Sequence, residues 1–590
     1  MDDLIFHRDT ASDANHDTLY SAPFIEKMFI GSEHPSLPPI DLVRFRALYP
    51  SDLEVLRVQQ QIQDAKDHIV QCDVEMENLC DSERISMLEE RKTCVCSRMN
   101  EYRAFISPVR KIPVEIWIEV FLLCLLDSGA GLEVEYRTIS APTLELSHVC
   151  AFWRAVVVST PELWSNLHIN LAHGGLEMLT AVKLYLDRSK TCPLDLTLVA
   201  QDDTEQTDDL GRRSWQVFAF LLDDHPRWSK VHLNFLWALL DHAEVKNLLQ
   251  SAKWNRCDIL KSLRIGFGDD WPWERHVYSP HFCRLLEQAP RLTSLHLDAF
   301  GKALSLPFSQ LHEITVSSLF SLQQVLDCFS MCPNLRKADI TVEYTTLDVL
   351  ESETRNTVYL SELRFLKCNF RRCLHASDIF PNLTMPAITH LELSPFAYIP
   401  MWEPALEACN SLQDVFSRSC CHLETLKLGI GFYGSGQGLV GILSTIPTLT
   451  HFEIDFLHPR GFNVAFLENL TLGEDSSTVP LLPRLLSFHI RTDVRPGAIK
   501  FLTRSYTDES DAAFPTPEAI LLMVKSRRLS HLTNLRGRPK LASFGFMAYF
   551  YAKQNPIPGK WAELFTSVAE PGLRVLEKDG MALTLKIVVC

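Results

Sequence analysis

The sequence predicts a multidomain protein in which an α-helical N-terminal part is followed by an α/β repeat domain. Three observations lead to this fold class: a heptad-like apolar seam between Val55 and Leu79, a very apolar segment at residues 107–126, and a short leucine pattern that recurs from residue 260 onward. A chain of 590 residues is too long for one domain. Because 46% of the residues are apolar and 22% are charged, most of the chain is expected to fold.

The overall charge limits the classes of partner. A formal net charge of -16 has the wrong sign for a protein that neutralises many phosphates, so we expect no nucleic-acid partner. The N-terminus lacks the pattern of a secretory signal and no run reaches the ~18 apolar residues that span a bilayer, so we expect no membrane partner. Its 17 cysteines, an odd number, indicate reduced buried thiols and a cytoplasmic or nuclear protein.

The N-terminal helical part begins after a leader. Residues 1–45 have little periodicity and end in a proline-rich stretch, which predicts a flexible segment. Residues 52–106 predict a coiled-coil-like helix or a helical hairpin, because apolar residues recur at steps of three and four. The pattern breaks near Asp81 and then resumes. Three and a half heptads suit either a homodimer through residues 52–106 or a hairpin within one chain.

Residues 107–168 predict three short helices. The first follows Pro113 and is apolar on nearly all sides, so it has to be buried on nearly all sides. The second covers LELSHVCAFWRAVVVST, in which Leu146, Val149, Trp153 and Val156 share one face. The third is TPELW, with Thr160 as the N-cap. A unit this small leaves much of its surface exposed, so we expect another segment or protein to cover the first helix.

The ordered set IPxEI, VF, VCxxWR and PxLW resembles the F-box, the module by which F-box proteins dock on a Skp-type adaptor. The coiled helix that runs into Ser-Pro-x-Arg before it is similar to a large fungal subset of that family. The resemblance implies a non-enzymatic substrate receptor of a Skp/cullin/F-box ubiquitin ligase. The long loop at residues 127–142 departs from compact F-boxes. The resemblance implies an adaptor-binding surface made of Ile112, Pro113, Ile116, Trp117, Val120 and Phe121, with Val149, Trp153 and Trp164 holding the three helices and contributing edges.

The rest of the chain, residues 190–590, repeats one theme. Segments of the form L-x-x-L-x-L predict short strands, and amphipathic helices that end at proline precede several of them, as in FCRLLEQAPRL, VLDCFSMCPNL and LVGILSTIPTL. Strand, helix and strand at this period predict a leucine-rich-repeat-like α/β solenoid with parallel strands. The spacing varies from 19 to 36 residues, so an ordinary open α/β domain is the alternative. The nine segments begin at Leu260, Leu292, Leu311, Leu335, Leu363, Ile388, Leu423, Leu449 and Leu485.

In a solenoid the residues between the strand leucines face one concave surface. A concave surface with charges of both signs suits an unknown protein target, although each residue alone is also explained as a solvated strand position. The residues that we expect to form this target-binding surface are His296, Asp298, Lys367, Glu392, Lys427, Glu453 and His489.

Other chemistry has weaker support, and we expect no cofactor. Residues 436–441 contain G-x-G-x-x-G after a predicted strand, with Asp455 beyond it, which nominally fits a dinucleotide-binding enzyme. The same strand, loop and helix recur without glycine at other repeats, so this motif is weak. Two groups, Cys368 with Cys373 and His375, and residues 420–422, lack the two-residue spacing of zinc ligands. Cys328 and Cys332 are expected to be core residues. The tryptophans of residues 271–273 are expected to lie in a loop that caps an end of the solenoid, with a binding platform as the alternative.

Overall fold

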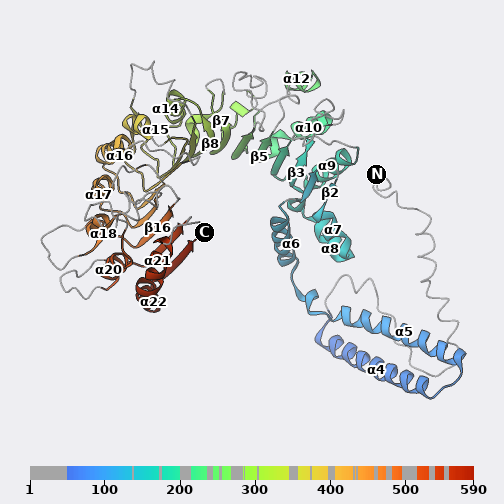
Figure 1. The fold of residues 1–590 in the computed structure, drawn as a ribbon. Helices are drawn as coiled ribbons and strands as arrows, with labels where there is room; N and C mark the ends of the chain where they lie inside the picture. Colours follow the sequence, from blue (N-terminus) through green and yellow to red (C-terminus); the bar gives the residue numbers. More distant parts are fainter. Residues whose placement is uncertain are drawn as a thin grey trace. The chain divides into compact units, whose positions relative to one another are not determined.

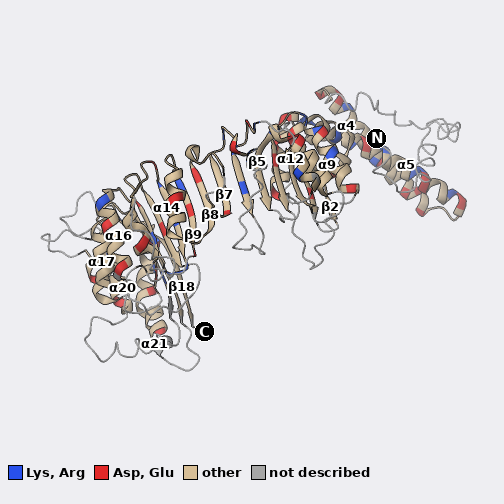
Figure 2. Cartoon of the chain, turned by 90° about the horizontal axis from the view of Figure 1, so that it is seen from above, with Lys and Arg blue, Asp and Glu red and all other residues tan. Residues whose placement is uncertain are grey.

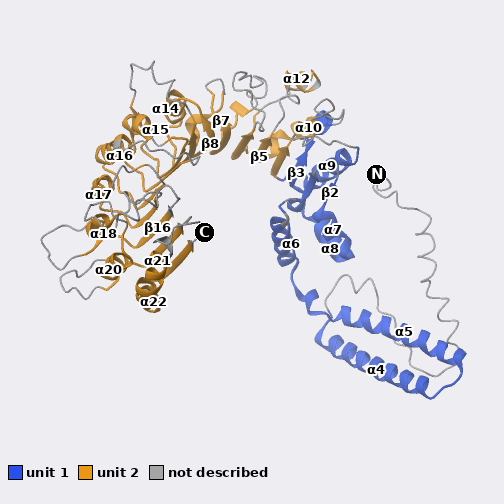
Figure 3. Cartoon of the chain, viewed as in Figure 1, with its two compact units in different colours: residues 1–192, 211–217 blue, residues 193–210, 218–590 orange. Residues whose placement is uncertain are grey.

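The computed structural model divides the chain into two compact units (Figure 3). One contains residues 1–192 and 211–217, and the other residues 193–210 and 218–590. The leader expected at residues 1–45 lies outside the described residues. The structure describes residues 50–590 with gaps at 130, 136–137, 172–175, 200–213, 235–242, 251–255, 267–283, 285, 302–304, 344–356, 373–374, 396–405, 430–431, 433–435, 457–462, 473–480, 495–514, 530–538, 551–556 and 590.

Residues 52–106 form a helical hairpin within the chain (Figure 1). Helix α4 (Asp52–Glu77) begins with a capping box in which Ser51 and Glu54 bond each other's backbone N–H groups, and α5 (Ser82–Phe105) begins at Asp81. The apolar seam of α4 packs against α5 rather than remaining open. The structure therefore selects the hairpin over an isolated helix, while homodimerisation stays a prediction. The buried residues shared by the two helices are Val58, Ile62, Ala65, Met99, Tyr102 and Phe105.

The rest of the first unit combines short helices with a small sheet. Strand β1 (Leu132–Glu135) pairs antiparallel with β2 (Thr138–Ser140) and parallel with β3 (Asn166–Asn170), and α9 (Leu176–Ser189) packs on β1. The loop expected at residues 127–142 thus contains two strands. The helices before β3 are η1 (Pro108–Lys111), α6 (Val114–Ser128), α7 (Pro142–Val149), α8 (Ala151–Ser159) and the 3₁₀ turn η2 (Pro161–Trp164).

The single helix expected over residues 144–160 is two helices, and this prediction was wrong. Cys150 has extended backbone angles, φ -160° and ψ 168°, which end α7. Its Sγ accepts a hydrogen bond from the backbone N–H of Trp153 at 3.4 Å, so Cys150 serves as the N-cap of α8. The apolar spacing does not reveal this break, because the side chains on either side of it keep their helical steps.

The second unit contains a large parallel sheet whose described strands lie in chain order (Figure 1). All nine predicted strands are confirmed, and each begins two residues after the first residue of its motif. The strands are β4 (Leu194–Val199), β5 (Trp228–Asn234), β6 (Ser262–Gly266), β7 (Ser294–Ala299), β8 (Glu313–Leu319), β9 (Lys337–Val342), β11 (Phe365–Phe370), β13 (His390–Pro395), β14 (Thr425–Leu428), β15 (His451–Phe456), β16 (Ser487–Val494), β17 (Ser543–Phe550) and β18 (Ala582–Val589).

Helices α14 to α18 cover one face of this sheet and leave the other face without helices in the described part of the unit (Figure 1). Two of the helices predicted before a strand motif are present as α14 and α17; in the third, Arg284, Leu286 and Glu287 are helical, while residues 282, 283 and 285 lie outside the described residues. A separate pair, β10 (Val358–Tyr359) and β12 (Leu383–Thr384), is parallel. The helices are α10 (Ser214–Asp223), α12 (Ala243–Gln250), α14 (Leu322–Met331), α15 (His375–Ile379), α16 (Leu406–Ser419), α17 (Gly436–Ser444), α18 (Val464–Leu470), α20 (Pro517–Arg528), α21 (Ile557–Leu564) and α22 (Glu570–Lys578).

The alternation of apolar and polar residues explains the two faces. In β7, Leu295 and Leu297 are buried toward the helices, while His296 and Asp298 on the opposite face are only partly buried. Neighbouring strands keep one register because each turn repeats the same bond: two successive N–H groups, such as those of Thr389 and His390, donate to one carbonyl of the preceding turn. Among the described residues, no helix is long and apolar enough to cross a membrane.

Candidate functional site

Helix α6 contributes two aromatic rings to a cluster of three in the core of the first unit. The ring centroids of Trp117 and Phe121 are 5.6 Å apart, and Trp153 of α8 lies 5.2 Å from Trp117 and 4.8 Å from Phe121. Phe121 is fully buried and Trp117 is 9% exposed. The expectation that Phe121 and Trp117 face a partner is therefore wrong, because Trp153 covers them from within the same unit.

Another side of α6, away from the buried Trp117 and Phe121, carries an exposed apolar stripe. Ile116, Val120 and Leu123 are 51%, 39% and 60% exposed, and their steps of four and three residues place them on one helical face. We call these three residues the α6 stripe. Ile116 and Val120 lie where the resemblance places them. Leu123 was missed, although its spacing from Val120 is a signal that the sequence contains.

Two more exposed apolar side chains stand at the junction of α7 and α8. Val149 is 60% exposed and Phe152 is 45% exposed. Val149 was expected to hold the helices together and to contribute an edge of the adaptor-binding surface. Its exposure contradicts the first role, because the side chain at the break between α7 and α8 is not in the core, and its binding role stays a prediction. Helix α6 contacts both α7 and α8, so these side chains belong to the same small unit as the α6 stripe.

The remaining predicted residues of this region have structural positions. Ile112 is half-buried, and the exposed Pro113 begins α6 by accepting hydrogen bonds from the N–H groups of Ile116 and Trp117 at 3.1 and 3.3 Å. Trp164 is fully buried, and its indole N–H donates to the carbonyl of Val157 at 2.8 Å. Trp164 thus holds η2 against α8, as expected.

The loop that departs from compact F-boxes is tied into this core. The hydroxyl of Tyr185 on α9 donates to the carbonyl of Gly131 at 2.7 Å, and Thr143 donates to the carbonyl of Leu163 at 2.9 Å. A Cβ at Gly131 would lie 2.9 Å from the Leu163 carbonyl oxygen, so only glycine fits there without a backbone shift. Burial raises the pKa of Tyr185, which keeps its hydroxyl a hydrogen-bond donor.

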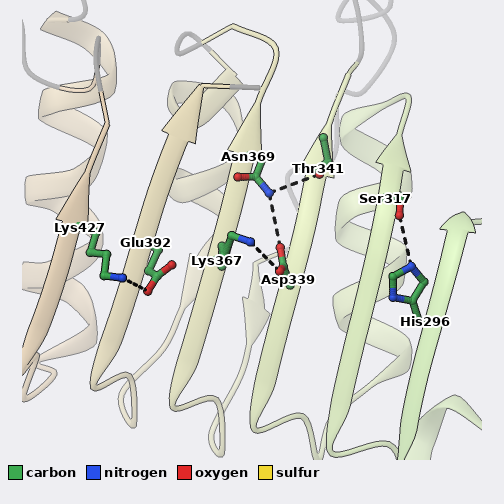
Figure 4. Close-up of polar contacts among 8 residues, drawn as sticks. All are labelled: His296, Ser317, Asp339, Thr341, Lys367, Asn369, Glu392 and Lys427. Carbon is green, nitrogen blue, oxygen red and sulfur yellow. Dashed lines mark hydrogen bonds and ion pairs between the residues drawn. The ribbon is translucent and has the colours of Figure 1, made fainter. Parts of the chain in front are cut away.

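The open face of the sheet in the second unit carries one continuous row of polar side chains (Figure 4). Strand pairing places them in register, so each side chain stands beside its neighbours on the two flanking strands. Figure 2 shows that acidic and basic residues are interspersed along the strands. We call this set the central row: Arg264, His296, Thr315, Asp339, Lys367, Glu392, Lys427, Glu453 and His489.

Charges of opposite sign alternate in the middle of the central row. Lys367 Nζ lies 2.9 Å from Asp339 Oδ2, and Lys427 Nζ lies 2.9 Å from Glu392 Oε1 (Figure 4). Lys427 is 3.8 Å from Glu453 on its other side, and its hydrogen bond to Glu392 raises the pKa of Lys427. Four of the residues predicted to bind a target are thus brought into one row of ion pairs.

The two predicted residues on β7 lie farther along the same face. His296 Nε2 is 3.4 Å from Ser317 Oγ and 3.8 Å from Asp298 Oδ1 (Figure 4 shows the contact with Ser317). A Cβ at Gly266 would lie 2.8 Å from Asp298 Oδ2, so the absent side chain at Gly266 provides room for this carboxylate. His489, at the other end, lies 3.0 Å from Ser543 Oγ.

A cavity of about 430 Å³ lies on this face across β13, β14, β15 and β16. We call it the β13–β16 cavity. Three of the residues predicted to bind a target line it: Lys427, Glu453 and His489. His390 and His451 were missed, although the recurring Thr-His pair in ITHLEL and LTHFEI is a signal for them. The lining residues are His390, Thr425, Leu426, Lys427, His451, Phe452, Glu453, Ser487 and His489.

The glycine motif at residues 436–441 has a packing role. A Cβ at Gly436 would lie 2.8 Å from Asn463 Oδ1, and one at Gly441 would lie 2.5 Å from Gln413 Nε2. Cys409 Sγ also donates to the carbonyl of Gly438 at 3.3 Å. These contacts place α17 close to its neighbours α16 and α18, so the glycines are explained without a dinucleotide.

The cysteine and histidine groups do not converge. No set of three His, Cys, Asp or Glu side chains in the described part of the chain has the geometry of a metal site. Cys368 and His375 are buried, and Cys373 lies outside the described residues, as do the tryptophans of residues 271–273. Burial raises the pKa of Cys332 to about 12 and lowers that of His375 to about 4, with nearby arginines adding to the effect on His375.

Comparisons with known proteins add no relative. No family model matches the chain, and no curated protein matches it.

Proposed function

We propose that this chain is an F-box-type substrate receptor of a Skp/cullin/F-box ubiquitin ligase. In this proposal the α6 stripe docks on the Skp-type adaptor, and the open face of the sheet, read as a leucine-rich-repeat-like solenoid, recruits a protein target. The observation that carries the proposal is the α6 stripe, which is exposed although the neighbouring Trp117 and Phe121 of the same helix are buried. It supports the motif resemblance with an independent physical feature.

The exposed apolar residues fit a protein interface better than a water-facing surface. Contiguous apolar patches on a soluble unit mark interaction sites, and the strongest ones centre on large side chains. The α6 stripe supplies Ile116, Val120 and Leu123, and Val149 and Phe152 supply two more at the α7–α8 junction. The packed rings of Trp117, Phe121 and Trp153 hold this surface in one arrangement, which lowers the entropy lost on binding.

Such a receptor catalyses no bond chemistry of its own. It raises the effective concentration of a target lysine near the conjugating enzyme, so both of its binding surfaces have to act in one molecule. The two units fit this division of roles: one carries the exposed α6 stripe, and the other carries a long polar sheet face. The ligase role implies a cytoplasmic or nuclear location.

The test is co-purification of the full chain with a Skp-type adaptor. Ile116→Asp places a charge in the α6 stripe and is expected to abolish capture, because an unpaired charge is costly in an apolar interface. Leu176→Asp is the matched control, since Leu176 is 57% exposed on α9 outside the α6 stripe. Equal capture of wild type and Ile116→Asp, or no capture of wild type, would remove the support for adaptor docking.

A second measurement separates a ligase receptor from an interaction scaffold. The adaptor complex is probed for cullin and for ubiquitin transfer to proteins that bind the sheet unit. Adaptor binding without cullin would show a scaffold that has the docking module but no ligase role.

A further inference from the structure

The β13–β16 cavity contains two histidines in equivalent positions of neighbouring repeats. His390 begins β13 and His451 begins β15, and strand pairing places Thr425 of β14 between them. Two strand spacings put their backbones about 10 Å apart. Each histidine follows a threonine, Thr389 or Thr450, so both rings are held in the same way.

The hydrogen bonds of these threonines determine which histidine nitrogen carries the proton. Thr389 Oγ1 donates its one hydrogen to the carbonyl of Arg364 at 3.1 Å, and Thr450 Oγ1 donates to the carbonyl of Glu424 at 2.9 Å. Each hydroxyl oxygen is also 2.8 Å from Nδ1 of the following histidine. Because the hydroxyl hydrogen is already used, Nδ1 is the donor and the oxygen accepts.

Neutral His390 and His451 therefore present Nε2 as a hydrogen-bond acceptor. Among the described residues, neither Nε2 atom has a hydrogen-bond partner. Both rings line the β13–β16 cavity, and neither is buried. The cavity thus has two oriented acceptors that the protein itself does not use.

The charges in the cavity favour a cation. Of the described residues that line it, only Lys427 carries a permanent positive charge, and its short contact is with Glu392 at 2.9 Å. Glu453 is 3.8 Å from Lys427 and 45% exposed, so its carboxylate retains acceptor capacity. Glu392 lies outside the lining and holds the Lys427 ammonium in its short ion pair, so the Glu453 carboxylate is left to interact with a bound cation.

His489 increases the space beside Glu453. A Cβ at Gly545 would lie 2.7 Å from His489 Nδ1, so the ring occupies the space above Gly545 on β17 and Nε2 reaches Ser543. The absence of a side chain at Gly545 lets His489 lean away from Glu453. Burial lowers the pKa of His489 and favours its neutral form.

We propose that the β13–β16 cavity binds a basic side chain, an arginine guanidinium or a lysine ammonium, of the protein target. This inference rests on the proposed role of the sheet face in target binding, and it specifies the chemistry of the bound segment. The donors of the basic group reach the Nε2 atoms of His390 and His451, and the Glu453 carboxylate balances its charge. Guanidinium has five donors in one plane, which suits several separated acceptors.

The test uses saturation-transfer-difference NMR on the full chain at pH 7.5. The probes are N-acetyl-arginine methylamide, N-acetyl-lysine methylamide and N-acetyl-citrulline methylamide, the last of which has the shape of arginine without its charge. The arginine and lysine arms identify which basic group binds. We expect at least one of these two probes to bind about fivefold or more tightly than the citrulline probe.

Three variants locate the binding. Glu453→Gln and His451→Phe are each expected to weaken binding of the basic probe about fivefold, and both positions are exposed enough to tolerate the change. Glu313→Gln is the matched control, because Glu313 is an exposed glutamate on β8 of the same sheet. Equal binding of the citrulline probe, unchanged binding in both cavity variants, or an equal loss in Glu313→Gln would overturn the proposal.

Adaptor capture is measured on the same variants. All of them leave the first unit unchanged, so capture is expected to match wild type. Failed probe binding with intact adaptor capture would overturn the cavity proposal alone, whereas specific probe binding without adaptor capture would overturn the receptor function and leave the cavity proposal standing.

Discussion

The buried and the exposed side chains of α6 should respond differently to truncation, and one pair of substitutions can test this. Phe121→Ala and Ile116→Ala each truncate an apolar side chain of the same helix, five residues apart. Phe121 is fully buried against Trp117 and Trp153, whereas Ile116 is 51% exposed. The F-box resemblance assigns both residues to one adaptor-binding surface, so the comparison tests what the structure adds.

The expected costs follow from burial. Truncating a fully buried phenylalanine removes its transfer free energy and leaves a cavity, which together destabilise a protein by about 3 to 5 kcal/mol. Truncating a half-exposed isoleucine on a surface is expected to cost about 0.5 kcal/mol. At about 1.4 kcal/mol for each factor of ten, Phe121→Ala should raise the opening equilibrium of this unit by a factor of about 100 or more.

Hydrogen exchange followed by mass spectrometry measures this opening locally, which suits a chain of two units. Peptides from α6 and α8 of Phe121→Ala should lose about two orders of magnitude in protection, while those of Ile116→Ala should change by less than about threefold. Peptides from β11 to β16 in the second unit serve as the internal control. Similar protection of α6 in the two variants would refute the assignment of Phe121 to the core.

Three further predictions concern other parts of the chain. Gly131→Ala should destabilise the first unit by about 1 to 3 kcal/mol, because its Cβ would press on the Leu163 carbonyl at 2.9 Å; unchanged exchange in β1 would contradict this. Ala65→Leu should overpack the hairpin and lower its melting temperature by circular dichroism, whereas Val70→Leu, at a position that is 61% exposed, should not; equal effects would argue against the hairpin seam. Burial lowers the pKa of His375 from 6.5 to about 4, so the unfolded chain binds the proton more readily between these values. Stability should therefore be full above pH 6.5 and should fall by about 2 kcal/mol by pH 5 in urea titrations, a loss that should be absent in His375→Phe.

Local apolar spacing was sufficient to locate nine of the strands and the helical seam of residues 52–106. Each strand motif places two or three apolar side chains on one face of an extended segment, and this alternation needs no information from distant residues. The same holds for α4, whose steps of three and four residues match a helical seam. That α4 packs against α5 of the same chain needed the tertiary structure, since a seam has the same pattern whether its partner lies in the same chain or in another.

The candidate sites were only partly predictable. Ile116 and Val120 lie on the exposed side of α6, and Lys427, Glu453 and His489 line one cavity. Their alignment across strands follows from the motif register. The sequence does not show that Lys427 binds Glu392 more closely than Glu453, because that choice depends on side-chain conformations set by neighbouring strands.

By itself the sequence located the nine strand motifs from Leu260 to Leu485 and the helical seam of residues 52–106, because these depend on apolar periods of 2 and 3.6 residues within a short stretch. Only the tertiary structure decided which apolar side chains of α6 are covered, because that depends on Trp153, which comes from another helix. It also placed Thr389 Oγ1 and Thr450 Oγ1 each between Nδ1 of the following histidine and a carbonyl of the preceding turn. Contacts between distant segments leave no periodic trace in the sequence, so burial and hydrogen-bond partners are properties of the folded chain.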